Sequence, residues 1–383
     1  MNTIIKYPRA KPYFSDSDKE GILRDIAEIL DTGMLTAGRH VAQFEKSFAL
    51  RMGVNHAIAV SSCTSALEIA IRALGLRGKK IMVTTNTWMS CANVILLTDN
   101  IPVIVDIDAD TLCMSRAAVV SQIDDIDAIL WVHMAGLISP DFLSIVEMCK
   151  ELGVYVIEDC AHAHGATTMT GQVAGSIGDV GCFSFYPTKL IATGEGGMIT
   201  TNNSDIDRLS RVYRNHGTTR NDESDGLDHG VTCHFPSQNY RMTEIAGVIG
   251  LYQLHQLSSF IEARNRIASE YRSKLRGISE IKLLPKYLGH VYWNFYIILD
   301  ASINRETFAL VLLNEFGIQT ANAYDPAIHR QELFSKYINV NEFSVADDIL
   351  RRHISLPMYT TLTTEDIDYI SQSVRHAAAA AKS

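Results

Sequence analysis

Short, continuous runs of apolar residues recur along the first half of the chain, and several consist almost entirely of Val and Ile. Runs of this kind are typical of strands that are covered on both faces, since neither face then needs polar side chains. The pattern predicts seven strands, at residues 57–60, 80–84, 102–107, 128–133, 154–158, 180–185 and 197–201.

Longer segments between these runs carry apolar residues at helical spacing. Three of them, residues 65–74, 89–98 and 140–152, predict helices that connect successive strands. Such strand–helix alternation implies right-handed crossovers and therefore a mostly parallel sheet between helices, the α/β class. Only a glycine-rich turn separates the last two strands, so the sheet is predicted to be mixed there.

The second part of the chain begins with a long helical stripe at residues 242–275, which is predicted to leave one domain and enter another. Beyond it, one predicted strand and three predicted helices follow. We therefore expect a large domain at 1–250 and a smaller C-terminal α+β domain at 251–383. The acidic segment 222–229 is expected to form a surface loop. The later elements are predicted at 291–299, 305–316, 346–352 and 364–380.

Composition narrows the class of protein. The 383 residues carry a formal net charge of −9 with a pI of about 5.8, which argues against general binding to nucleic acid or to an anionic membrane. No apolar run reaches the ~18 residues of a membrane span, and the N-terminus lacks the apolar region of a signal peptide. The seven cysteines include no CxxC pair, so we expect free thiols and a cytoplasmic protein.

An acidic pair ends the predicted strand at 154–158, in the stretch YVIEDCAHAHGA. Open α/β sheets bind ligands beyond the carboxyl ends of their strands, where Asp159 would meet a protonated heterocycle nitrogen. The alternative is an acid that caps the next turn. A metal site built from Cys160, His162 and His164 is the weakest interpretation, because no second ligand cluster follows.

Hydroxyl residues gather where another strand meets a helix, in AVSSCTSALEIAIRAL. Free N–H groups at a helix start favour a phosphate, and Ser61, Ser62, Thr64 and Ser65 lie at that position. An ordinary N-cap is the alternative, since serine and threonine are good caps. Four hydroxyls in five positions exceed what a cap requires.

A single lysine, Lys189, stands in the glycine-rich turn FYPTKLIATGEGG, five residues after Ser184. Lysine becomes a nucleophile toward carbonyls when burial or neighbours lower its pKa, although a solvated turn lysine is the usual alternative. Trp88 opens a helix at the same predicted edge, where it would either pack in the core or stack on a flat cofactor. Together, the acid, the hydroxyl-rich helix start, the aromatic and the lysine suit pyridoxal 5′-phosphate (PLP).

Several blocks of the sequence resemble the DegT/DnrJ/EryC1/StrS sugar aminotransferases nearly end to end. They include VIEDCAHAHGA, GDVGCFSFYPTKLIATGEGGMITTN and QNYRMTEIAGVIGLYQL, in the order of the family. The resemblance implies the PLP-dependent transferase fold type I, with a seven-stranded large domain and a smaller C-terminal domain. It also implies a homodimer whose active sites lie at the interface.

The resemblance assigns roles to residues of this chain. Lys189 would bind the cofactor covalently and later move protons, and Asp159 would pair with the ring nitrogen. Asn239 would reach the phosphate of the partner subunit's cofactor. The remaining expected cofactor contacts are Trp88 at the ring face, His162 near the phenolic oxygen, and Ser62, Thr64, Ser65 and Ser184 at the phosphate.

Three positions depart from the family pattern: Cys63 stands in place of a usual Gly, His162 in place of Gln, and Leu190 in place of Asn. A branch of the family with His in place of the lysine acts as a sugar 3-dehydratase. Retention of Lys189 therefore favours transamination.

The expected reaction moves an amino group from an amino acid, L-glutamate, to a keto sugar linked to a nucleotide. A PLP-dependent sugar dehydratase or lyase, a keto-cyclitol aminotransferase and a binding protein without catalysis are the alternatives. Candidate substrate contacts are Tyr324, His329 and Arg214, for which surface or structural roles are the alternative.

Overall fold

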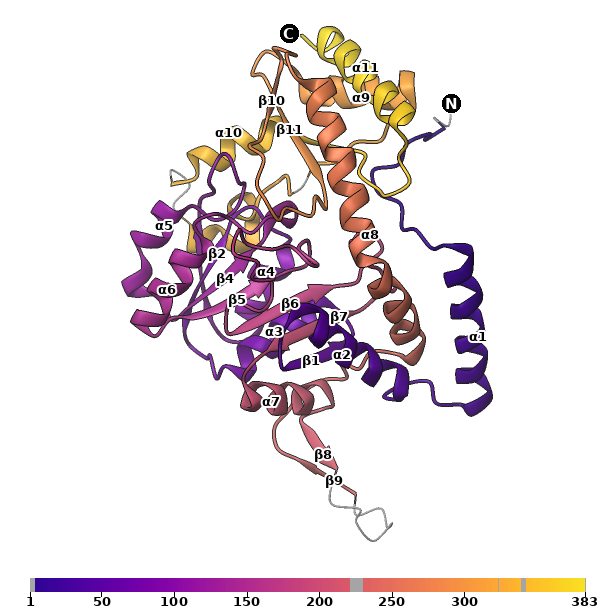
Figure 1. Cartoon of the computed structure of the whole chain (residues 1–383). Helices are drawn as coiled ribbons and strands as arrows, with labels where there is room; N and C mark the ends of the chain where they lie inside the picture. Colours follow the sequence, from indigo (N-terminus) through magenta and orange to yellow (C-terminus); the bar gives the residue numbers. More distant parts are fainter. Residues whose placement is uncertain (1–3, 221–229, 323, 339–341, 383) are drawn as a thin grey trace.

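A computed structural model describes residues 4–220, 230–322, 324–338 and 342–382 of the chain (Figure 1). The predicted acidic loop at 222–229 lies outside these residues. Within the described part of the chain, no helix combines the length and apolarity needed to cross a bilayer.

A seven-stranded sheet forms the centre of the large lobe, and all seven predicted strands are confirmed (Figure 1). Its strand order is β1-β7-β6-β5-β4-β2-β3. Only β7 runs antiparallel to its neighbours, so the prediction of a mixed sheet at the glycine-rich turn is also confirmed. The strands are β1 (His56–Val60), β2 (Lys80–Thr84), β3 (Ile101–Val105), β4 (Ala128–Val132), β5 (Tyr155–Asp159), β6 (Val180–Ser184) and β7 (Gly197–Thr201).

The strands are buried on both faces, as their continuous apolar runs require, and helices cover them. Part of the core is aromatic: Phe48 of α2 (Arg39–Met52) meets Phe183 of β6 edge-on, with ring centroids 4.9 Å apart. The predicted crossover helices are confirmed within two residues at each end. The helices of this lobe are α2, α3 (Cys63–Ala73), α4 (Met89–Leu97), α5 (Arg116–Val120), α6 (Phe142–Leu152) and α7 (Ser204–Arg214).

The pattern of apolar residues gave no element before the first strand, yet helix α1 (Asp16–Thr32) forms there, as does α2. Helix α1 starts at a capping box between Ser15 and Asp18 and ends at Gly33 in the left-handed region. It lies along α8 (Glu244–Leu275) at the side of the molecule (Figure 1) and buries only a narrow strip of side chains, so its apolar signal is weak.

Helix α8 confirms the predicted long helix, and it runs from the large sheet to a second, smaller core (Figure 1). A division of the chain at residue 250 would fall inside this helix and stays a prediction. The second core holds a three-stranded antiparallel sheet in the order β10-β11-β12. Its elements are β10 (Ile281–Leu283), β11 (Phe295–Leu299), α9 (Arg305–Phe316), α10 (Ser344–Arg352), β12 (His353–Leu356) and α11 (Thr364–Ala380), while β8 (Thr218–Arg220) and β9 (Val231–Cys233) form a separate hairpin.

The strand predicted at 291–299 begins only at Phe295. The preceding backbone is held by the large lobe instead, because the amides of Val291 and Trp293 donate to the carbonyls of Gly136 and Ala135. This contact places Trp293 at the junction of the two lobes, ahead of the strand.

A buried arginine on α8 ties the helix to this junction. Nη1 of Arg264 donates to the carbonyls of Tyr292, Trp293 and Met358, at 3.0, 3.1 and 3.2 Å. Burial lowers the pKa of this guanidinium to about 10. Three segments that are distant in sequence therefore depend on one side chain.

We expect Arg264→Met to lower the free energy of unfolding by about 1–3 kcal/mol, because three buried carbonyls lose their donor. Urea unfolding measures this difference. Ser269→Ala, on the exposed face of the same helix, is the matched control and should change the free energy by less than about 0.5 kcal/mol. Equal stability of the two variants would contradict the anchoring role.

Candidate active site

A cavity of about 510 Å³ opens at the carboxyl ends of the parallel strands. Residues that follow β1, β2, β5 and β6 line it, and these four ends meet at one edge because the strands run in the same direction. The same cavity is also lined by Trp293, by Ala321, Asn322, Tyr324 and Asp325, and by Arg9 from the chain start. Three remote parts of the sequence thus meet around one space.

Lys189 lies in the turn after β6, and its amine is 4.3 Å from the centroid of the Trp293 ring. The indole N–H of Trp293 donates to the carbonyl of Thr188 at 2.7 Å, which fixes the ring beside the lysine. Burial lowers the pKa of the amine to about 8, although the charge of Asp159 opposes this shift. A neutral, nucleophilic amine is therefore accessible near neutral pH.

Asp159 ends β5 and is almost fully buried beneath the cavity. Its Oδ1 accepts from the amide of Ala161 at 2.9 Å, and its Oδ2 accepts from the thiol of Cys91 at 2.9 Å. Burial, followed by the charge of Asp159, raises the pKa of Cys91 well above its usual range, so the thiol keeps its proton and donates. The carboxylate is therefore held in a fixed orientation from two sides.

The start of α3 combines both interpretations of its hydroxyls. Ser62 caps the helix by accepting from the amide of Ser65 at 3.1 Å, and Ser65 accepts from the amide of Ser62 at 3.0 Å. The capping alternative is thus present. Ser62, Cys63 and Thr64 nevertheless line the cavity, and the first amides of a helix have no partner within it. The position of the helix start at the cavity and its unpaired amides together provide a site for an anion.

Gly197, the first residue of β7, explains part of the glycine-rich turn. A Cβ there would lie 2.4 Å from the carbonyl carbon and oxygen of Ser62. Only glycine allows β7 to approach the start of α3 this closely. The turn that carries Lys189 and the start of α3 are thereby held together.

Aromatic rings form one wall of the cavity. His162 stacks on Trp293 with ring centroids 3.6 Å apart, and its Nε2 is 3.0 Å from the hydroxyl of Tyr324. Burial, with a smaller contribution from the charge of Lys189, lowers the pKa of His162 well below its usual range, so the ring is neutral. Trp88 is 57% exposed, and its ring centroid lies 6.1 Å from that of Tyr324.

The structure brings most of the predicted site residues together. Eight of them line the cavity: Ser62, Thr64, Trp88, Asp159, His162, Ser184, Lys189 and Tyr324.

Four predicted residues do not line the described part of the cavity. Ser65 serves the capping box, and Asn239 is exposed, with its Oδ1 accepting from the amide of Arg241. Arg214 pairs with Glu45, and His329 lies buried between Thr85 and Asp347 at 2.7 and 2.9 Å. Their functional roles stay predictions, while Arg214 and His329 have the structural contacts that were the alternative.

Other lining residues were not predicted from the sequence. Tyr186 and Glu195 belong to the glycine-rich turn that carries Lys189, whereas the others come from segments without a motif of their own. The further lining residues include Arg9, Tyr186, Glu195, Trp293, Asn294, Asn322 and Asp325.

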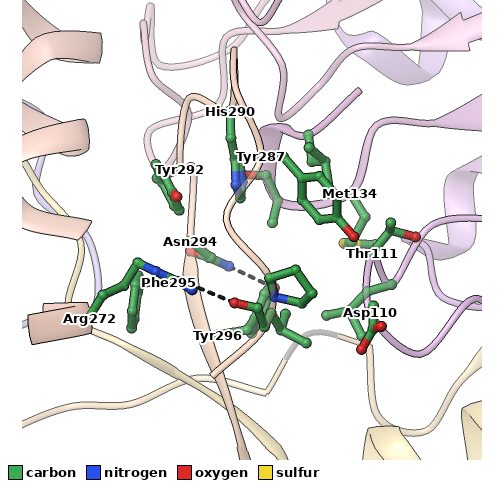
Figure 2. Close-up of a pocket in the computed structure, with 15 residues that line it drawn as sticks. Asp110, Thr111, Met134, Arg272, Tyr287, His290, Tyr292, Asn294, Phe295 and Tyr296 are labelled. Carbon is green, nitrogen blue, oxygen red and sulfur yellow. Dashed lines mark hydrogen bonds between the residues drawn. The ribbon is translucent and has the colours of Figure 1, made fainter. Parts of the chain in front are cut away.

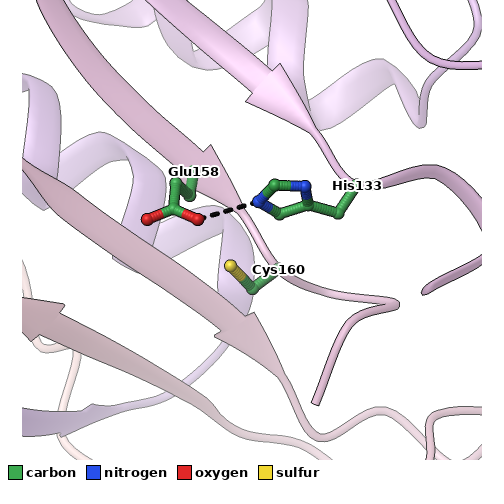
Figure 3. A group of neighbouring side chains, drawn as sticks. All are labelled: His133, Glu158 and Cys160. Carbon is green, nitrogen blue, oxygen red and sulfur yellow. Dashed lines mark hydrogen bonds and ion pairs between the residues drawn. The ribbon is translucent and has the colours of Figure 1, made fainter. Parts of the chain in front are cut away.

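One buried group has the composition of a metal site: His133, Glu158 and Cys160 (Figure 3). Both oxygens of Glu158 are already engaged, because they accept from His133 and from the amides of Gly175, Ile177 and Gly178. Burial raises the pKa of Cys160 well above its usual range, which disfavours the thiolate that a metal needs. Glu158 instead fixes the loop before β6.

The other histidine of the metal hypothesis, His164, is fully buried against Phe183 and Phe185. Burial lowers its pKa to about 3, so it is a neutral core residue. The cluster in Figure 3 does not include either His162 or His164.

A second cavity lies between the loop at Met134 and the segment before β11, lined by Tyr287, His290 and Tyr292 (Figure 2). Its volume of about 30 Å³ suits a water molecule at most. It therefore cannot hold a cofactor or a sugar, whereas the cavity at Lys189 contains eight of the predicted site residues and is the candidate active site.

A lysine amine of lowered pKa, a buried carboxylate and a helix start at one sheet edge define a PLP-dependent enzyme of fold type I. The family model described as the DegT/DnrJ/EryC1/StrS aminotransferase family matches residues 16–375. The chain belongs to this family, and it is an aminotransferase.

Curated relatives match the chain over nearly all of its length. GDP-perosamine synthase of Escherichia coli O157:H7 is 32% identical and covers 97% of this chain and 98% of its own. The UDP-N-acetyl-3-dehydro-α-D-glucosamine 3-aminotransferase of Acidithiobacillus ferrooxidans is 33% identical, with 98% of each chain covered.

Solved structures share the fold. The aminotransferase TlmJ from Streptoalloteichus hindustanus superposes with a TM-score of 0.88 at 25% identity, covering 98% of this chain and 99% of its own. A GDP-4-keto-6-deoxymannose-3-dehydratase has the same TM-score and identity, with coverage of 96% and 100%. A Streptococcus pneumoniae structure of this fold, at 24% identity, was solved in a PLP form.

The residues of the cavity fit PLP, which is the cofactor of this enzyme. The start of α3 would hold its phosphate, Asp159 its ring nitrogen and Lys189 its aldehyde, while Trp88 and His162, which also line the cavity, would contact the ring. When bound, the cofactor supplies a sink for the electrons of a broken C–H bond.

The amine of Lys189 should control cofactor uptake, because only the neutral amine attacks an aldehyde. We expect the rate at which cofactor-free protein binds PLP covalently to rise with pH, with a midpoint near 8. In Asp159→Asn the midpoint should move lower, since the charge of Asp159 raises the pKa of Lys189. Absorbance of the bound cofactor measures both. A midpoint near that of free lysine, or no shift in the variant, would contradict this reading.

Proposed function

We propose that this enzyme transfers the amino group of L-glutamate to a keto sugar that is linked to a nucleoside diphosphate, yielding an amino sugar. Two relatives support the acceptor class, since their names give a GDP-linked amino sugar product and a UDP-linked keto sugar. The cavity volume of about 510 Å³ supports an acceptor larger than an amino acid.

The position of Lys189 carries the proposal. Its amine lies inside the cavity, has a lowered pKa, and shares the cavity with the carboxylate of Asp159. After release from the cofactor, Nζ would take the proton from Cα of the donor and return a proton to the carbon that accepts the amino group. Asp159 would hold a proton on the ring nitrogen, and Cys91 would keep the carboxylate in place.

The aromatic wall supplies position rather than proton transfer. Trp293 limits the movement of the amine by its contact at 4.3 Å, and it also supports the ring of His162. The hydroxyl of Tyr324, which packs against the core of the large lobe, reaches His162 from a segment that pairs with β12 at Ala321. The wall would exclude water from the amine while the proton is moved.

A sugar dehydratase is the second candidate, because a solved dehydratase shares the fold at the same TM-score as an aminotransferase. Retention of a lysine in the cavity supports transamination over this alternative. A keto-cyclitol in place of the keto sugar would leave the chemistry at Lys189 unchanged, so the geometry does not separate these two acceptors.

A homodimer is part of the proposal. Trp88, Met89 and Tyr186 are 57%, 38% and 47% exposed beside the cavity, which leaves large apolar surface for a second copy to cover. The exposed Asn239 would then reach the phosphate site of the partner. A location in a reducing cytoplasm is also proposed, supported by seven cysteines that are all free thiols.

The acceptor class is tested with ¹⁵N-labelled L-glutamate and a panel of GDP- and UDP-linked keto sugars. We expect the label in the sugar product, equimolar 2-oxoglutarate, and loss of more than about 10³-fold in turnover in Lys189→Ala. Lys150→Ala, an exposed lysine on α6, is the control and should retain wild-type turnover. A deoxygenated sugar without the label would establish the dehydratase. Label found only in the product of a keto-cyclitol would show that the acceptor is a cyclitol and not a nucleotide-linked sugar.

Hybrid dimers test the role of Asn239. Lys189→Ala and Asn239→Ala protomers, each impaired alone, are unfolded together and refolded as a mixture. If Asn239 serves the partner's site, one site of each hybrid is intact and the mixture regains roughly a quarter of wild-type turnover. If Asn239 serves its own site, no hybrid site is intact, and mixing gives no gain. A monomer in solution would also contradict the proposal.

A further inference from the structure

Arg9 belongs to the cavity although it lies at the start of the chain. The backbone around it is fixed on the second core: the amides of Lys6 and Tyr7 donate to the carbonyl of Gly317, at 2.9 and 3.0 Å. The amide of Arg9 donates to Oε1 of Gln319, and its carbonyl accepts from the amide of Met358, each at 3.2 Å. The segment therefore carries Arg9 to the cavity wall in a defined position.

The side chain of Tyr7 strengthens this attachment. Tyr7 is buried, and its hydroxyl donates to Asp366 of α11 at 3.0 Å. Its backbone also pairs with Ile318 as a parallel bridge, next to the strand-like residues that lead toward Ala321 and Asn322 at the cavity. The contacts of Tyr7 and Gly317 are enough to attach the segment, so they do not explain why an arginine, Arg9, lines the cavity.

Charge is unevenly distributed around the cavity. Among the lining residues that the structure describes, Lys189 and Arg9 are the only lysine and arginine, while Asp159, Glu195 and Asp325 are acidic. Asp325 already has a cationic partner, because its Oδ2 accepts from Arg305 at 2.6 Å. The guanidinium of Arg9, in contrast, has no hydrogen-bond or ion-pair partner within the described part of the chain. Lys189 must react as a neutral amine, so Arg9 is the cation left for a substrate.

The positive charge of Arg9 acts on groups in and behind the cavity wall. Burial lowers the pKa of Lys189 and raises the pKa of Tyr296 and Tyr324. The charge of Arg9 has a smaller effect, which lowers the pKa of all three groups. Lys189 and Tyr324 line the cavity, and Tyr296 is packed behind Asn294. The positive charge thus lies close enough to act on groups on two sides of the cavity.

We propose that Arg9 is a substrate-binding residue whose guanidinium holds an oxyanion of the substrate beside Lys189. The inference rests on the proposed function, in which both substrates are anionic: the donor has carboxylates, and the acceptor has a diphosphate. Arginine binds such groups through two parallel N–H···O contacts, which fix orientation as well as charge. An unpaired arginine at the wall of a reactive cavity matches this chemistry.

The test compares Arg9→Gln, Arg9→Lys and the control Lys11→Gln, which removes an exposed charge two residues away outside the cavity lining. Two half-reactions are followed separately by the absorbance of the cofactor. In the first, PLP enzyme meets L-glutamate. In the second, glutamate-treated enzyme meets GDP-4-keto-6-deoxymannose or UDP-N-acetyl-3-dehydroglucosamine, whichever the wild type accepts.

We expect Arg9→Gln to weaken binding by about ten- to a hundred-fold in at least one half-reaction, with the limiting rate changed less. Arg9→Lys should regain part of the loss, and Lys11→Gln should equal the wild type. A loss confined to the first half-reaction assigns the donor carboxylate, a loss confined to the second assigns the diphosphate, and loss in both shows that the two anions share Arg9.

The melting temperature separates binding from structure. It should be unchanged in Arg9→Gln, since the guanidinium has no partner in the described chain. Unchanged binding in both half-reactions, or an equal loss in Lys11→Gln, would overturn the proposal for Arg9. Turnover by the wild-type enzyme would then still support the proposed function. Failure of the wild type to convert L-glutamate would instead contradict the proposed function itself.

Discussion

The burial of one amine beside one carboxylate is the constraint on which the site depends. Desolvation favours the neutral form of Lys189, whereas the charge of Asp159 favours the protonated form, and the balance leaves the pKa at about 8. A more deeply buried amine without the carboxylate would have a lower pKa and would lose its electrostatic attraction to Asp159. An exposed amine would stay charged at neutral pH. The fold must therefore fix both groups at a chosen depth, and much of the surrounding structure serves this purpose.

The two groups are fixed from opposite directions. Asp159 is the last residue of a buried strand, and the preceding Glu158 holds the neighbouring loop through its bonds to backbone amides. Lys189 instead lies in a turn, whose position depends on the contact of Trp293 with Thr188 and on the close approach of Gly197 to Ser62. Strand geometry therefore places the acid, and Cys91 and the amide of Ala161 orient its carboxylate, whereas the amine depends on contacts of its turn with remote segments.

The sequence predicts the parts of this structure that depend on local pattern. Buried Val and Ile runs reveal the strands, and the residues at their carboxyl ends, such as Asp159 and Ser62, follow from the direction of a parallel sheet. The weakly apolar α1 and the late start of β11 at Phe295 could not be read in this way. Both depend on tertiary contacts: α1 lies on α8, and the amide of Trp293 bonds to Ala135 instead of to a strand partner. For the same reason, the sequence pattern did not predict Arg9 and Trp293 as site residues.

Attachment of the chain start to the second core links stability with selectivity. Gly317 accepts from Lys6 and Tyr7, and a Cβ on this glycine would lie 2.9 Å from the carbonyl of Ile4, so the two segments tolerate little displacement. Arg9 and Asn322 both follow this attachment in the two parallel segments, and both line the cavity. The N-terminal segment and the segment that leads to Asn322 are thus tied to each other at the cavity wall. If Arg9 binds substrate, changes in the N-terminal segment can alter substrate binding while the backbone contacts that position Lys189 and Asp159 stay intact, because these come from other segments.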